Sequence, residues 1–255
     1  MALHTSSRTV RTALAGAVAA SALLLSGCSF VEEARLKTAE ADATFTEAVT
    51  AVELTGLRRG SVTVTPGSGP GVTVHRVVHY RGDTAPEPGQ RVSGGVLGFT
   101  DGCSGDGDSC WVDYRLEVPA SVRLKAGSSS GDITVTGVAS AELDSSSGDV
   151  RAERIAGPLK VRTSSGDLTA AELSGPEFEF RTSSGDSTVG FAKAPASVSV
   201  TTSSGDVTLR APQAPYRVSV DTASGKRDVT LGDAPDAPSR IAVRTSSGDI
   251  RLSAV

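Results

Sequence analysis

Seven aspartates recur at nearly constant intervals and are the residues of this chain best placed to do chemistry as a group. Six directly follow a glycine, as in Ser129-Ser130-Gly131-Asp132-Ile133, and one follows Gly225 after an intervening Lys226-Arg227. Stacked in a column they could bind cations, and two carboxylates could act as acid and base on a glycosidic bond. The seven are Asp132, Asp149, Asp167, Asp186, Asp206, Asp228 and Asp249.

The repetition of these acids argues against catalysis, because a catalytic pair should stand out as an exception to a repeat. Carboxylates stacked about 5 Å apart repel one another, so backbone N–H groups, solvent, arginines or cations must compensate. We favour aspartates that satisfy their own turns, with a cation or ligand along the column as the alternative. We predict no catalytic residue, no metal site and no cofactor; a polysaccharide-active enzyme is the competing function.

The histidines His75 and His79 lie four residues apart in a strand-like run. Four residues of strand span about 13 Å, which is too far for two ligands to share one ion without help. We therefore predict that both are surface residues of a strand.

The first residues of the chain are typical of a secretory signal. Arg8 and Arg11 precede an apolar run from Ala13 to Leu25, and Leu25-Ser26-Gly27-Cys28 closes it, so residues 1–27 are predicted to be a signal peptide. Leu-Ser-Gly-Cys resembles the bacterial lipobox, which makes Cys28 the predicted lipidation site and a membrane anchor. The alternative is ordinary secretory cleavage with Cys28 as a spare thiol. Without residues 1–27, 23 Lys+Arg stand against 29 Asp+Glu, a net charge of −6 that does not favour nucleic acid.

Cys103 and Cys110 are the only other cysteines. In an extracytoplasmic compartment an isolated pair most often forms a disulfide, and this one would close a short loop. Asp101, Asp106 and Asp108 lie in or beside that loop, but their spacing is not that of an EF-hand. Asp-Gly runs are common in turns, so turn formation is favoured there over calcium binding.

The elements that position the repeated aspartates are short strands. The glycines before or near them, at 131, 148, 166, 185, 205, 225 and 248, lie 17 to 23 residues apart, a period typical of solenoids. Apolar residues alternate on both sides of each turn, as Val198 and Val200 do before one and Val207 and Leu209 after it. We therefore predict an all-β fold, a β-solenoid of about seven stacked coils over residues 116–255, each made of strand, Ser-Gly-Asp corner, strand and return loop.

The N-terminal part of the mature chain lacks these corners. Residues 28–43 are polar and are predicted to be a tether, and residues 44–115 a β cap for the solenoid. In the sixth repeat, Lys226-Arg227 looks like an insertion, after which Asp228 resumes the pattern. At the other end the chain stops three residues after Leu252, which predicts an uncapped last coil and self-association through it.

Three features together resemble the bacterial putative-adhesin family of β-strand-repeat domains of unknown function. They are Gly60-Ser61-Val62-Thr63-Val64, the Leu-Glu-Val-Pro segment at 116–119, and the serial Ser-Gly-Asp corners followed by an aliphatic residue. The resemblance covers about Val49 to Val255 and implies a surface-exposed β-solenoid without catalytic residues. Ser187 and Ala223 are local departures from the repeat.

The predicted function is therefore a membrane-anchored, surface-exposed, non-catalytic module of the cell envelope. Its partners would be the membrane, through the lipid, and an envelope protein or polysaccharide, with the aspartate column as one possible binding edge. The alternative is an envelope-stress sensor or regulator that binds a membrane protein, and the sequence does not separate the two.

Overall fold

The computed structural model of this chain describes residues 35–100, 102–103 and 109–255. The chain divides into Met1–Glu32 and Glu33–Val255, and every described residue belongs to the second unit. The predicted signal peptide and Cys28 lie outside the described residues. Within the described part of the chain, no helix is long and apolar enough to cross a membrane.

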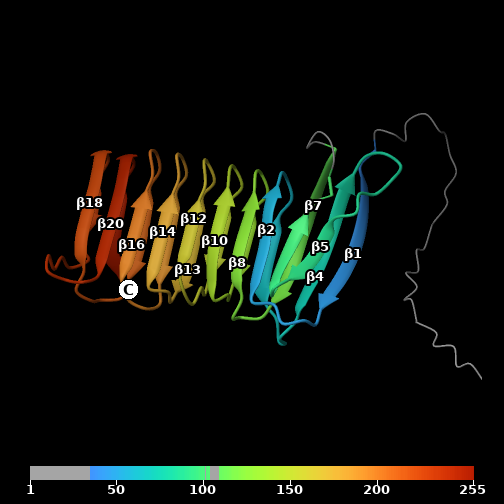
Figure 1. Cartoon of the computed structure of the whole chain (residues 1–255). Helices are drawn as coiled ribbons and strands as arrows, with labels where there is room; N and C mark the ends of the chain where they lie inside the picture. The colour runs from blue at the N-terminus through green and yellow to red at the C-terminus, as the bar shows by residue number, and fades with distance from the viewer. Residues whose placement is uncertain (1–34, 101, 104–108) are drawn as a thin grey trace, which may run out of the picture. The chain divides into compact units, whose positions relative to one another are not determined.

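The described residues form 21 strands in two sheets, which confirms the all-β prediction (Figure 1). The eleven-stranded sheet is called sheet A, and the ten-stranded sheet is called sheet B. In spatial order sheet A consists of β1 (Lys37–Phe45), β4 (Val72–Tyr80), β7 (Cys110–Val118), β3 (Val62–Pro66), β9 (Ile133–Thr136), β11 (Val150–Glu153), β13 (Leu168–Leu173), β15 (Ser187–Phe191), β17 (Val207–Ala211), β21 (Ile250–Ala254) and β19 (Arg227–Val229). Sheet B consists of β18 (Arg217–Ser224), β20 (Arg240–Ser247), β16 (Ser197–Thr201), β14 (Glu177–Arg181), β12 (Leu159–Arg162), β10 (Ser140–Ser145), β8 (Arg123–Ser128), β2 (Ala51–Leu57), β6 (Val96–Thr100) and β5 (Gly89–Ser93).

Each coil of the predicted solenoid is present and contributes one parallel strand to each sheet. Alternate residues point between the sheets: Val161 of β12 is fully buried and lies in register between Leu143 of β10 and Phe180 of β14. Burying one such side chain stabilises the fold by roughly 1.5–3 kcal/mol. Since a single coil buries too little apolar surface to fold alone, each coil depends on contacts with its neighbours.

Close approach between coils explains the glycine in each corner. A Cβ built on Gly148 would overlap the carbonyl oxygen of Gly131 in the neighbouring coil, and the same overlap recurs at Gly166. Gly205 also has φ of +140°, which favours glycine for a second reason. Both reasons make the corner glycine necessary for stacking at strand spacing.

A column of buried hydroxyl groups satisfies the corners from inside. The backbone N–H of Gly166 donates to Thr163 Oγ1 at 3.0 Å, while the hydroxyls of Thr182 and Thr202 donate to the carbonyls of Ser184 and Ser204 at 2.9 and 3.0 Å. Such bonds offset the cost of burying polar groups beside an apolar core.

The last two coils are stacked out of sequence order. β20 lies between β16 and β18, and β21 lies between β17 and β19, so the seventh coil in sequence is intercalated between the fifth and the sixth (Figure 1). The prediction that the C-terminal coil is the outermost one is therefore wrong. The sixth coil ends the stack, so the edge strands at this end are β18 and β19.

The register also corrects the interpretation of Lys226-Arg227 as an insertion. Arg227 aligns with Ile250, Asp228 with Arg251 and Val229 with Leu252. Lys226 therefore takes the place of Asp249, and Arg227 takes the place of a core isoleucine. Arg227 donates from Nη2 to the carbonyl of Thr222 at 2.8 Å.

The predicted boundaries of the N-terminal regions also need correction. Residues 37–43, expected in the tether, belong to β1, which pairs antiparallel with β4. β2 and β3 already form a coil on the first repeat, with Gly60-Ser61 at its corner, so the regular stack begins within the region 44–115. The antiparallel strands β1, β4 and β7 extend sheet A beyond it, and Cys103 is joined to Cys110 by a disulfide with a Cα–Cα distance of 5.6 Å.

Candidate binding surfaces

The corner aspartates form a ladder of hydrogen bonds from coil to coil. Oδ1 of Asp132 accepts the backbone N–H of Asp149 at 3.0 Å, and Oδ1 of Asp149 accepts that of Asp167 at 2.9 Å. The ladder continues through Asp186, Asp206 and Asp249, with distances of 2.8 Å. Each carboxylate thus satisfies the corner of the next coil, whereas the sequence led us to expect that it satisfies its own. Donation from backbone N–H groups compensates for stacking like charges.

Asp228 does not belong to this ladder, in contrast to the prediction. The last donor is the backbone N–H of Lys226, 2.9 Å from Oδ1 of Asp249. Asp228 lies instead in β19, in register with Arg251. The ladder therefore ends at a lysine, which offers no carboxylate to a further coil.

At the other end, beyond Asp132, Asp113 makes an equivalent bond that sequence reasoning missed; it is separated from the ladder by Ser61, which offers no carboxylate. Oδ1 of Asp113 in β7 accepts the backbone N–H of Ser61 at 2.7 Å, and its Oδ2 lies 2.8 Å from Nε2 of His79. The signal was the position of Asp113 immediately before the buried Tyr114, as each corner aspartate precedes a buried residue. It lacks the preceding glycine that marks the other corners.

Both histidines lie on the outer side of sheet A, paired with acids. His79 stacks on Trp111 of β7 with ring centroids 4.7 Å apart. The guanidinium of Arg59 lies over the same indole, 5.5 Å from its centroid. His75 Nδ1 lies 2.8 Å from Asp42 Oδ1. Within the described residues no group of three or more His, Cys, Asp or Glu side chains could hold a metal ion. This cluster is packed together by ring stacking and by hydrogen bonds between the histidines and carboxylates.

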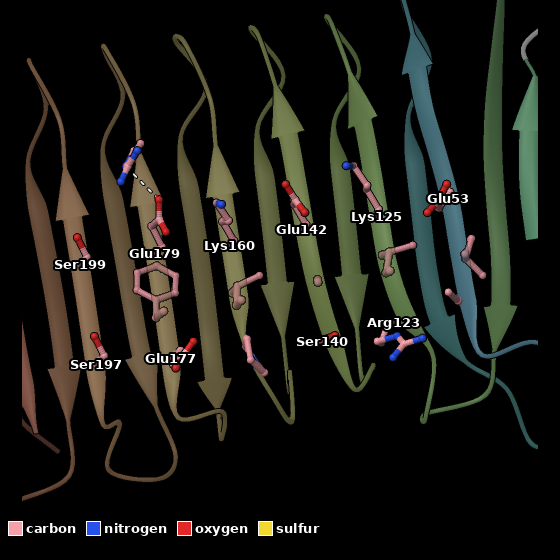
Figure 2. A pocket seen from close by; sticks show the side chains of 18 of the residues that line it. Glu53, Arg123, Lys125, Ser140, Glu142, Lys160, Glu177, Glu179, Ser197 and Ser199 are labelled. Carbon is pink, nitrogen blue, oxygen red and sulfur yellow. Dashed lines mark ion pairs between the residues drawn. The ribbon is translucent and has the colours of Figure 1, made fainter. Parts of the chain in front are cut away.

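A second surface, the outer face of sheet B, is hollowed along its length. A hollow of about 820 Å³ extends over strands from β2 to β20 and is lined mainly by their outward side chains. In Figure 2 these side chains project from the strands in a row that crosses Glu53, Lys125, Glu142, Lys160 and Glu179. The register places each of these residues directly opposite the next one on the neighbouring strand.

Most charges on this face are sorted by strand; the exception is Arg181 at the end of β14. β8 carries Arg123 and Lys125, β10 carries Glu142 and Asp144, β12 carries Lys160 and Arg162, and β14 carries Glu177 and Glu179. We call these eight residues the striped face. Sequence analysis did not detect the stripes, because neighbouring stripes lie 15 or more residues apart in the chain.

Half of these eight residues form ion pairs in the described part of the chain, one of them with Arg181 outside the striped face. Arg162 Nη1 lies 3.4 Å from Glu142 and 3.8 Å from Asp144, and Glu179 pairs with Arg181 at 3.0 Å. Exposed pairs of this kind contribute about 0–1 kcal/mol to stability. The stripes are therefore a weak source of stability and a distinctive pattern for recognition.

The architecture is that of a parallel β-solenoid with an antiparallel N-terminal extension, a class defined by its stacked coils. The chain belongs to the Toastrack DUF4097 family, whose sequence profile matches residues 113–253. No curated protein sequence matches the chain.

Three solved structures are similar to this chain at low identity. A putative cell adhesion protein from Clostridium sporogenes ATCC 15579 is 10% identical, with a TM-score of 0.35 over 86% of this chain and 100% of that chain. Putative adhesins from Parabacteroides distasonis ATCC 8503 and Parabacteroides merdae ATCC 43184 are 13% and 12% identical, with TM-scores of 0.49 and 0.47. They cover 88% and 87% of this chain, and 98% and 97% of their own chains.

Proposed function

We propose that this chain is a non-catalytic binding module, anchored to the cell membrane through a lipid on Cys28 and exposed at the cell surface. Its contact surface is the outer face of sheet B. The observation that carries this proposal is the hollow of about 820 Å³ over that face, whose charged lining residues alternate in sign from β2 to β14 except for Arg181. Long rows of polar side chains on a regular sheet suit an extended or flat partner.

The anchor is supported by the sequence at the N-terminus. The apolar run from Ala13 to Leu25 ends in Leu25-Ser26-Gly27-Cys28, which resembles a lipobox. Cys28→Ala should move the protein from the membrane fraction to the soluble extracytoplasmic fraction. Unchanged sedimentation of the variant with membranes would contradict the anchor.

Binding is favoured over catalysis by how the acids are used. Oδ1 of Asp167, Asp186 and Asp206 each accepts a backbone N–H from the neighbouring coil, so these carboxylates serve the stacking of coils. On the outer face of sheet B, Glu142 and Glu179 each pair with an arginine. These arrangements support a structural and recognition role for the acids.

The binding surface can be tested by neutralising it without changing the net charge. The variant Lys125→Ser, Glu142→Ser, Lys160→Ser, Glu179→Ser should lose most of its binding to isolated envelope fragments, measured by co-sedimentation. A matched control on the outer face of sheet A, Arg115→Ser, Glu117→Ser, Arg151→Ser, Glu153→Ser, should bind like the parent. Equal binding by both variants would contradict the proposed surface.

A further inference from the structure

The charges of the striped face on sheet B are arranged symmetrically, with opposite signs on the two sides of a central line between β10 and β12. β8, β10, β12 and β14 are consecutive neighbours, and their striped-face residues are positive, negative, positive and negative. Arg181, at the end of β14, is a positive charge outside this pattern, and Gly127 of β8 stands at its register position. The pattern reverses its sign on reflection across the line between β10 and β12. Any residue of the striped face therefore has an oppositely charged counterpart at the same distance on the other side of that line.

This pattern makes the face complementary to itself. A two-fold axis that lies along the line between β10 and β12, parallel to the strands, brings β10 of one copy onto β12 of another and β8 onto β14. It preserves the position along each strand, so it pairs Arg123 with Glu177, Lys125 with Glu179, Glu142 with Lys160, and Asp144 with Arg162. By symmetry each pair occurs twice, and every charge of the striped face meets an opposite charge.

We propose that the striped face binds the striped face of a second copy of this chain. The proposal rests on the proposed function, since it names the partner of the same surface. Such contacts would be polar, hydrated and sensitive to salt, because exposed charge pairs are screened beyond about 8 Å at physiological ionic strength. Electrostatic complementarity of this kind selects the partner and the register more than it raises the affinity.

The unpaired members of the striped face support an intermolecular role. Within the described part of the chain, Arg123, Lys125, Lys160 and Glu177 form no ion pair, although oppositely charged residues lie on neighbouring strands. Pairing inside one sheet therefore uses only part of the charge that the face carries. The remaining charges are available to the facing copy.

The two-fold arrangement also fits the proposed anchor. Because the axis is parallel to the strands, the stacks of the two copies run in opposite directions. The described chain begins at β1, at one end of sheet A, so the two copies would begin at opposite ends of the pair. This geometry joins molecules anchored in two facing membranes, where many weak contacts act together.

Two charge-reversed variants test this inference by complementation. Variant one carries Glu142→Lys and Asp144→Lys, and variant two carries Lys160→Glu and Arg162→Glu. In a contact between identical variants the reversed stripe meets a like charge, whereas in a mixed contact every pair is opposite again. Intramolecular repulsion would differ: it is present in each variant and is not relieved by mixing them.

The measurement is clustering of neutral phosphatidylcholine vesicles that carry the full mature lipoprotein, followed by light scattering. Parent vesicles should cluster, and vesicles with either variant alone should cluster on the order of tenfold more slowly. Mixed vesicles of the two variants should regain at least half of the parent rate. Salt at 0.5 M should suppress clustering, because it shortens the Debye length to about 4 Å and so screens the charge pairs. Controls with the same charge change on sheet A, Glu117→Lys with Glu153→Lys and Arg115→Glu with Arg151→Glu, should cluster like the parent.

A second pair guards against misfolding. Lys125→Glu and Glu179→Lys change one residue each and should show the same loss alone and recovery when mixed. No clustering by the parent, or no recovery in either mixture, would overturn the proposal of a second copy as partner. In that case, loss of envelope binding by the four-serine variant would leave the proposed surface in place with a different partner.

Discussion

Oδ1 of Asp206 accepts the backbone N–H of Asp249 at 2.8 Å, although the two residues are 43 positions apart in the chain. The intervening sixth coil is excluded from this contact, because Asp249 lies between Asp206 and Lys226 in the ladder. The ladder thus follows the spatial order of the coils and skips their order in sequence. It identifies the sixth coil as the end of the stack.

Lys226 and Arg227 of the sixth coil should prevent end-to-end association of two molecules, and substituting them should permit it. Lys226→Asp with Arg227→Ile restores the carboxylate and the core aliphatic residue found in inner coils. We expect the variant to form concentration-dependent end-to-end oligomers through the open edges of β18 and β19. Sedimentation velocity in 0.5 M salt, which suppresses contacts between charged faces, should reveal them. A variant that sediments like the parent at all concentrations would contradict the role of these two residues.

Aspartates in the ladder should contribute to the stability of the fold, whereas Asp228, outside the ladder, should not. Asp206→Ala removes the acceptor for the N–H of Asp249 and should lower the free energy of unfolding by about 1 kcal/mol. Asp206→Asn keeps an acceptor and should cost less. Asp228→Ala, outside the ladder, is the matched control and should be nearly neutral. Denaturant unfolding gives all three values, and an equal loss for Asp206→Ala and Asp228→Ala would contradict the ladder.

Tyr216 should make the stability of the fold depend on pH in the alkaline range. Its buried hydroxyl donates to the carbonyl of Pro212 at 2.9 Å, in the loop that leads from β17 to β18. Burial raises the pKa of this hydroxyl above its ordinary value of about 10. The folded state therefore keeps the proton at a pH where the unfolded state loses it, so stability is unaffected below about pH 10 and falls as the pH rises further.

Tyr216→Phe separates the two effects of this group. It should cost about 1 kcal/mol at neutral pH through the lost hydrogen bond, and it should flatten the decline in stability above about pH 10. Thermal unfolding between pH 8 and 11 measures both. An unchanged alkaline slope in the variant would show that other groups cause the decline.

The solenoid could be predicted from sequence because each coil repeats the same local information. Alternation of residues such as Val198 and Val200, and the glycine in each corner, specify strands and corners without reference to distant residues. The order of the last two coils could not be predicted this way. It depends on which coil tolerates unpaired edge strands at the end of the stack. That tolerance rests on Lys226 and Arg227, and their positions in the register are revealed only by the pairing of β19 with Ile250 of β21.

The candidate site was less accessible to sequence reasoning than the fold. The corner aspartates were found because they recur, but their acceptor role toward the next coil requires the stacking distance. Asp113 lacks the glycine of the repeat and was missed. The striped face joins strands from Arg123 to Glu179, and its pattern exists only in the register of sheet B.

The five lysines of the chain allow the most direct test of the central claim, that the outer face of sheet B is the contact surface of a cell-surface module. Lys125 and Lys160 lie on that face, whereas Lys193 and Lys226 are exposed elsewhere. A membrane-impermeant acylating reagent should label all four in the purified protein. On intact cells it should label Lys193 and Lys226 fully and Lys125 and Lys160 several-fold less. Equal labelling of the four on cells would contradict the contact surface, and no labelling of any would contradict exposure at the cell surface.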